Sequence, residues 1–139
     1  MTHPGRVAVT LVKIAAVYLV VSLVIGMYMA ITHNHALATV HSHVALLGWA
    51  TMALTGLVYL QLPACAANRL AAAHFWLHNI GLPVMLGALT ALILTGDERV
   101  EPAIGAGSTL VLLALVCFTI NVVRCARAPE AGAPPISRS

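Results

Sequence analysis

Apolar residues run almost without interruption through four stretches of the chain, at residues 7–31, 41–62, 70–95 and 102–123. Each stretch has the roughly 20 residues that a helix needs to cross the hydrocarbon core of a bilayer. The pattern predicts an all-α integral membrane protein, with a four-helix bundle formed by residues 1–127. Residues 128–139 are rich in Pro, Ser, Gly and Ala and lack the apolar content to fold, so we expect a disordered cytoplasmic tail there.

The first apolar stretch shares one feature with a secretory signal peptide, a short basic start before an apolar run. Its apolar run is longer than the usual 7–15 residues and has no small-x-small cleavage site at its end. We therefore expect it to be a membrane-spanning helix.

Composition excludes two classes of protein. Hydrophobic residues make up 60% of the 139 residues and charged residues only 8%, whereas about a quarter of the residues in a soluble domain are charged. Seven Lys and Arg against four Asp and Glu are too few to follow a phosphate backbone. We expect contact with membrane lipid and none with nucleic acid. The three cysteines form no Cys-x-x-Cys pair, so any haem would be held non-covalently.

Basic residues are distributed unequally between the two sides of the predicted spans. Those on the first side are Arg6, Lys13, Arg69, Arg124, Arg127 and Arg138. The opposite loops hold only Arg99, which is surrounded by acidic residues. Because cytoplasmic loops carry the Lys and Arg excess, both termini should be cytoplasmic in a multi-pass protein of a bacterial-type inner (plasma) membrane.

The histidines form two groups along the predicted spans. The outer group is His33, His35, His41 and His43, and the inner group is His74 and His78. Ionisable or metal-binding side chains in a membrane helix are costly and usually functional. At 1.5 Å per residue the two groups are about 20 Å apart in depth, so we expect that they do not share one haem or metal.

His41 and His43 point about 200° apart on a helix and cannot chelate one ion from a regular helix. The face that continues from His41 is small enough for a flat cofactor or a close partner helix to approach. It consists of Ala45, Gly48, Met52, Gly56 and Tyr59. Alternatively, both histidines are interfacial residues that face water.

Two consecutive segments carry a resemblance to a known family. The sequence HSHVALLGWATMALTGLVYLQLP, at residues 41–63, resembles the tenth transmembrane helix of the catalytic subunit of cbb-type cytochrome c oxidases, with a similar His-x-His, a Gly-Trp step, and then Tyr and Pro. The sequence HFWLHNIGLPVML, at residues 74–86, resembles the start of the eleventh helix, which also opens with His-Phe-Trp-Leu and reaches an Ile-Gly step. The chain is thus similar to the haem-copper oxidase superfamily, to which nitric oxide reductases belong.

The resemblance implies a b-type haem protein that transfers electrons, with a redox partner protein, or binds a gas such as O2 or NO. In those oxidases the two histidines of this motif bind two different haems. By position His41 corresponds to the high-spin haem ligand and His43 to the low-spin one. The family's subunit has twelve helices, however, and this chain has neither an adjacent His-His pair for copper nor a counterpart of the cross-linked tyrosine, so the resemblance does not imply reduction of either gas.

The oxidase subunit is arranged as three pseudo-symmetric arcs of four helices. The resemblance therefore implies a homo-oligomer, with a trimer favoured, in which His43 of one subunit faces His41 of its neighbour across a shared haem. Alternatively, the assembly is a dimer or includes a partner subunit, or His33 or His35 completes the coordination within one chain.

Other functions stand beside haem binding. Four outer histidines within eleven positions could bind copper or zinc, as in a metal-binding accessory protein. His74 and His78, one helical turn apart, could chelate a second metal or haem, or have a structural or interfacial role. A purely structural four-helix membrane protein is the third alternative.

Overall fold

The fold is entirely helical over residues 4–126, the part of the chain that the computed structural model describes. Four segments are long and apolar enough to cross a membrane: Gly5–Thr32, Ala38–Gln61, Arg69–Thr95 and Glu98–Cys125. The predicted all-α fold with four such helices is therefore confirmed. The predicted tail at residues 128–139, together with Arg127, lies outside the described residues.

The elements follow a simple order along the chain. They are α1 (Pro4–Thr32), α2 (Ala38–His43), the π-helix η1 (Val44–Thr51), α3 (Met52–Gln61), α4 (Pro63–Ala66), α5 (Arg69–Thr95), the 3₁₀ turn η2 (Glu98–Val100) and α6 (Glu101–Ala126). The second span consists of α2, η1 and α3 without a break. It begins at Ala38 rather than at residue 41, because the carbonyl of His35 already accepts a hydrogen bond from the amide of Ala38 (3.0 Å).

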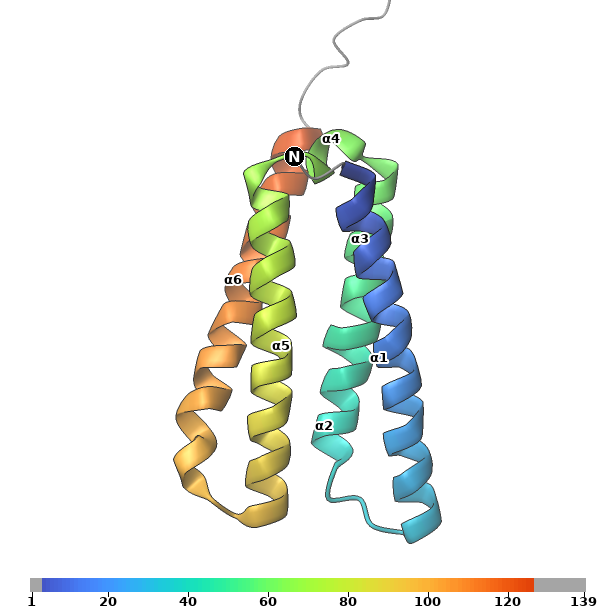
Figure 1. Ribbon diagram of the computed structural model, residues 1–139, viewed down its shortest axis with the longest axis vertical. Coiled ribbons are helices and arrows are strands. Elements are labelled where there is room, and N and C mark those ends of the chain that lie inside the picture. Colours follow the sequence, from blue (N-terminus) through green and yellow to red (C-terminus); the bar gives the residue numbers. More distant parts are fainter. Residues whose placement is uncertain (1–3, 127–139) are drawn as a thin grey trace, which may run out of the picture.

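The four spans form two helical hairpins (Figure 1). α1 packs against the second span, and α5 packs along α6. The hairpins also contact each other, since α5 touches α1, α2 and η1. α4 lies at one end of the bundle, where α1 starts and α6 finishes; we call it the terminal end. The opposite end, which holds loop residues 33–37 and 96–100, is the loop end. Both ends of the described chain therefore lie on the same side of the bundle.

Two glycines allow α5 and α6 to approach closely. A Cβ atom added to Gly107 would lie 2.6 Å from the backbone nitrogen of Met85 and 2.7 Å from the carbonyl oxygen of Gly81. A Cβ at Gly81 would lie 2.8 Å from the carbonyl oxygen of Gly107. Only a shift of the backbone could relieve such contacts, so both positions require glycine. Small residues at a crossing are a common way for membrane helices to pack, because lipid is as apolar as their side chains.

The small-residue face of the second span packs against α1. A Cβ at Gly48 would lie 2.6 Å from the ring of Tyr18, and one at Gly56 would lie 3.1 Å from the carbonyl oxygen of Ala8. The sequence left open whether a cofactor or a helix approaches this face. In the structure, α1 lies against it.

The second span is irregular where the sequence predicted a uniform helix. Residues Val44–Thr51 form a π-helix, which has i→i+5 pairing. Within it the carbonyl of Leu46 accepts a hydrogen bond from the Thr51 hydroxyl (2.8 Å), and the carbonyl of Leu47 accepts one from Nε2 of His78 (3.1 Å). Side chains thus reach the backbone where the helix is wider. Such π segments frequently occur at functional sites.

A small polar network ties the helices together at the terminal end. The amide of Asn121, on α6, donates to the carbonyl of Cys65 (2.8 Å) and lies 3.5 Å from the Tyr59 hydroxyl. Its side-chain oxygen accepts from the amide of Asn68. Asn68 also caps α5, because its side-chain oxygen accepts from the backbone of Ala71 (3.0 Å). Asn121 therefore links α6 to α3, to α4 and to the start of α5.

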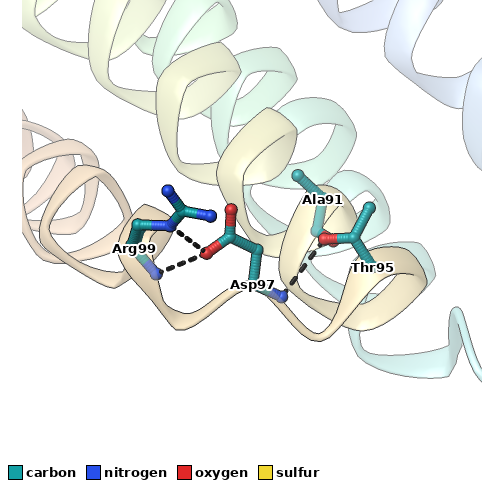
Figure 2. Close-up of polar contacts among 4 residues, drawn as sticks. All are labelled: Ala91, Thr95, Asp97 and Arg99. Carbon is teal, nitrogen blue, oxygen red and sulfur yellow. Dashed lines mark hydrogen bonds and ion pairs between the residues drawn. The ribbon is translucent and has the colours of Figure 1, made fainter.

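The loop end is closed by local polar contacts, shown in Figure 2. α5 ends at Gly96, which has the left-handed conformation (φ 69°) favoured by glycine. The backbone of Asp97 donates to the Thr95 hydroxyl (3.2 Å), and the guanidinium of Arg99 pairs with the Asp97 carboxylate (3.0 Å). The basic residue of this loop thus has an acidic partner beside it.

Candidate functional site

His41 lies between the second span and α1, at the loop end. Its Nδ1 is 2.9 Å from the carbonyl oxygen of Ser22 and 3.3 Å from the Ser22 hydroxyl. The ring packs over Gly26, where an added Cβ would lie 3.0 Å from the ring atom Cε1. Gly26 therefore leaves room for the imidazole, and Ser22 orients it.

The carbonyl partner fixes the tautomer of His41. A backbone carbonyl can only accept a hydrogen bond, so Nδ1 must carry the proton. A neutral ring then has its lone pair on Nε2, where it is free to bind a metal. A hydrogen bond from the other ring nitrogen to a carbonyl is also what orients ligand histidines and raises their basicity. His41 has the protonation that a metal ligand needs.

His43 has the same protonation in different surroundings. Its Nδ1 is 2.8 Å from the carbonyl oxygen of Thr39, in its own helix α2, so this nitrogen also donates and Nε2 again holds the lone pair. Both His41 and His43 are partly exposed. Because one ring is held by α1 and the other by α2, the two rings occupy different environments.

The loop histidines are not gathered with the other two. His33 and His35 are exposed, and His33 has a positive φ of 53°. The loop is held locally, since the side chain of Asn34 accepts from the backbone of Ala36 (3.0 Å). Within residues 4–126, no three His, Cys, Asp or Glu side chains converge as a metal site would require. The sequence allowed a copper or zinc site formed from His33, His35, His41 and His43, but a single chain does not assemble one.

His74 and His78 are completely buried, with 0% of each residue exposed. They lie one turn apart on α5, with ring centroids 5.7 Å apart and ring planes at 87°. Gly81 and Met85, which continue the same face of α5, are buried as well. The interfacial alternative for His74 and His78 is wrong, because neither ring has surface to present to water or headgroups.

Aromatic rings pack against His74, one member of the inner pair. The ring centroid of Tyr59 is 5.7 Å from that of His74, and the centroid of Phe118 is 5.3 Å from it. Tyr59 and Phe118 also contact each other, at 5.5 Å. The second span, α5 and α6 thus each contribute a ring to one cluster.

Three nitrogens of the inner pair have no hydrogen-bond partner. Nε2 of His78 donates to the carbonyl of Leu47, so its lone pair is on Nδ1, which is buried and unpaired. Both ring nitrogens of His74 are buried and unpaired. An unpaired buried polar atom costs about 1–3 kcal/mol, and a native protein that keeps one usually has a use for it.

The two histidine groups lie closer in depth than the sequence predicted. His78 reaches the carbonyl of Leu47, which is only four residues after His43 in the second span. At 1.5 Å per residue, the nearest members of the two groups differ in depth by roughly 6–10 Å rather than about 20 Å. The length of the His78 side chain accounts for part of this difference.

The thiol of Cys65 is neutral. Cys65, in α4 between the second and third spans, is buried, and burial raises the pKa of its thiol to about 11. The thiolate is the form that binds metals, and in the absence of a metal Cys65 is therefore a neutral thiol at neutral pH.

Comparisons of the chain with protein-family models, with curated proteins and with solved structures find no match. The site is therefore interpreted from its own geometry.

Several residues of the site have no recognisable signal in the sequence. Ser22 and Gly26 look like ordinary members of an apolar helix, yet they hold His41. The Leu47 carbonyl and Phe118 meet the inner pair from distant parts of the chain. A small residue opposite a histidine makes room for its ring, and Gly26 is such a residue. The sequence alone does not show that Gly26 lies opposite His41, because this depends on how α1 pairs with the second span.

Proposed function

We propose that this protein is a b-type haem-binding membrane protein, related to the haem-copper oxidase superfamily, that transfers electrons or binds a gas such as O2 or NO. One observation carries the proposal. His41 and His43, the pair in the resembled His-x-His, both donate from Nδ1 to a backbone carbonyl and so keep the Nε2 lone pair available. Haem iron is commonly bound by such histidine nitrogens.

The donor set fits a haem better than a bare metal ion. His41 is oriented by α1 and His43 by its own helix, so each ring offers a single nitrogen to a separate iron. The haem would supply one-electron chemistry or an open position for a gas. The protein would supply the axial ligands, fix their orientation through the Ser22 and Thr39 carbonyls, and surround the macrocycle with apolar residues.

A second chain would complete each haem site. A haem between two histidines needs a ligand on each face, and His41 and His43 do not face each other in one chain. Large apolar side chains on the half of α1 that carries Ser22 are exposed, and a neighbouring subunit could cover them; they include Val20, Leu23, Val24 and Met27. We favour a ring of three chains, in which His43 of one subunit and His41 of the next bind one haem.

The charge distribution supports an orientation in the membrane. Arg6, Arg69 and Arg124 lie at or near the terminal end, whereas Arg99 at the loop end is paired with Asp97. We therefore assign the terminal end to the cytoplasm of a bacterial-type cell and the haem sites to the outer half of its inner membrane. A redox partner protein would then exchange electrons at that outer side.

The decisive experiment is an absorption spectrum of the detergent-purified protein, oxidised and then reduced with dithionite. Sharp reduced α and Soret bands are expected in the wild-type protein, and the His41→Ala, His43→Ala double variant should lose them while still inserting into the membrane. The matched control is the His33→Ala, His35→Ala variant, which should keep the bands. An unchanged spectrum in the first double variant would exclude the proposal. A colourless wild-type protein with stoichiometric copper or zinc would favour the accessory-protein alternative.

A mixing experiment tests whether the haem is shared between chains. His41→Ala and His43→Ala protomers should each bind little haem alone. Co-expressed, they should recover part of it, because about a quarter of the interfaces in a randomly mixed ring receive both intact histidines. Coordination by His33 or His35 within one chain predicts no recovery. A haem-loaded monomer in native mass spectrometry would rule out the shared site.

A further inference from the structure

The inner pair, His74 and His78, offers donor nitrogens that the proposed haem sites do not use. Nδ1 of His78 holds a lone pair because Nε2 donates to the Leu47 carbonyl. A neutral His74 ring also has one lone pair, and neither of its nitrogens has a partner. Each ring therefore keeps an unused lone pair, in a place where water does not reach.

The distance between the rings permits one shared ion. When two imidazoles bind one ion at about 2.0 Å, each ring centroid lies about 3.2 Å from it, so the centroids can be at most about 6.4 Å apart. The centroids of His74 and His78 are 5.7 Å apart. The hydrogen bond from His78 to Leu47 is also the second contact that orients a ligand histidine.

The uncharged surroundings of the pair favour an ion of low charge. The groups around the pair are neutral, namely the rings of Tyr59 and Phe118 and the amide of Asn121 beyond Tyr59. The carboxylates of the described residues, on Asp97, Glu98 and Glu101, lie at the loop end, away from this cluster. A divalent ion would bring two uncompensated charges into the bundle, and a monovalent ion only one.

We propose that His74 and His78 bind one Cu(I) ion in the middle of the bundle. Cu(I) carries a single charge, accepts imidazole nitrogen and is stable with two ligands, which matches what the site provides. Nδ1 of His78 and one nitrogen of His74 are its ligands, and the aromatic cluster excludes water from it. The site is complete within one chain, in contrast to the haem sites.

The test requires a protein in which the other histidines cannot bind copper. We define the outer-histidine-free variant as the chain in which the four outer histidines and also His3 are replaced. Its substitutions are His3→Ala, His33→Ala, His35→Ala, His41→Ala and His43→Ala. This full-length chain is loaded with Cu(I) under ascorbate without oxygen, and excess copper is removed with the chelator bicinchoninate. About one copper per chain should remain, and adding His74→Leu and His78→Leu should lower this to about a tenth or less. Leucine is chosen because it keeps the pair apolar and filled.

A matched control lies beside the pair on α5. Asn79 donates to the carbonyl of Phe75 (2.7 Å) and is only partly buried, so the Asn79→Leu variant should keep its copper. Cu(I) should also raise the melting temperature of the outer-histidine-free variant and leave that of the double-leucine variant unchanged.

X-ray absorption of the loaded outer-histidine-free variant gives a reading that does not depend on how the leucine variant folds. Two nitrogen ligands and no sulfur are expected. Sulfur coordination, copper that survives both leucine substitutions, preferential retention of Zn²⁺, or no copper after loading would each overturn the site. Because this variant lacks His41 and His43, its result is independent of whether the wild-type protein binds haem.

Discussion

Histidine is used differently in two regions of this bundle. At the loop end, His41 and His43 donate to backbone carbonyls and remain partly exposed, each with one nitrogen left free. Nearer the middle, His74 and His78 are sealed from solvent, and three of their four ring nitrogens have no partner. The first pair is held by separate helices, whereas the second lies on one helix, one turn apart.

This difference shows what helical spacing decides. Two residues of separation direct His41 and His43 into different spaces, so neither can bind the same ion as the other within one chain. Each would need a second ligand from another chain or from the loop. Four residues of separation put His74 and His78 side by side, so they can act together. For this reason we propose a site shared between chains at the loop end and a site within one chain in the middle.

The largest expected effect concerns the side of the membrane on which each end lies. Alkaline phosphatase, which is active only outside the cytoplasm, should be inactive when fused to the C-terminus. Inserted after Asp97, it should be active, with a contrast of about tenfold or more, because the proposed orientation puts the basic terminal end in the cytoplasm. A cytoplasm-active reporter at the same positions serves as the control. The reverse pattern would exchange the two ends and contradict the assignment of the outer haem sites.

The fold was largely predictable from the sequence because the bilayer imposes a simple rule on length and polarity. Four apolar stretches gave four spans, and the second span ends shortly before Pro63, which starts α4. The π-helix at residues 44–51 was not predictable, because its residues are as apolar as a regular helix requires. The hydrogen bond from His78, a residue distant in sequence, helps to stabilise this π-helix.

The candidate site was predictable only as a set of residue types. The sequence named the six histidines, but burial and hydrogen bonding depend on how the hairpins pack. The spacing alone could not show that α1 orients His41 through Ser22, or that Phe118 covers His74. These contacts join residues that are 19 and 44 positions apart in the chain, beyond the reach of any local pattern.

The next prediction tests the polar network that supports the inner pair. Replacing Asn121 with Leu should lower the free energy of unfolding by about 1–3 kcal/mol, because it leaves the carbonyl of the buried Cys65 without its partner, whereas the exposed Asn68 amide can bond to water. The melting temperature should fall by several degrees while the haem spectrum of the loop end is kept. Thr119→Val is the control, since Thr119 is exposed and bonds only within its own helix. Equal stability of the two variants would show that the network contributes little.

A smaller effect is expected at the glycine under His41. Replacing Gly26 with Ala puts a Cβ 3.0 Å from the ring, so the imidazole must move by a few tenths of an ångström. The affinity for haem should fall by about twofold to fivefold, less than the loss of an orienting hydrogen bond causes. Titration of the apoprotein with haemin measures this. Gly105→Ala, where an added Cβ meets nothing within 4 Å, should leave the affinity unchanged, and an equal loss in both variants would argue against contact with His41.

The smallest effect is expected from Ser22→Ala, and it separates two ways of holding His41. The Ser22 carbonyl accepts from Nδ1 at 2.9 Å, while the hydroxyl lies further away, at 3.3 Å. Removing the hydroxyl keeps the carbonyl, so Nδ1 should stay protonated, Nε2 should keep its lone pair, and the haem content should stay within about twofold of the wild-type value. If the hydroxyl instead donated to Nδ1, Nε2 would carry the proton in the wild-type protein and could not bind iron. A clear gain of haem in Ser22→Ala would therefore reveal that opposite tautomer, and a complete loss would show that the hydroxyl, rather than the carbonyl, orients the ring.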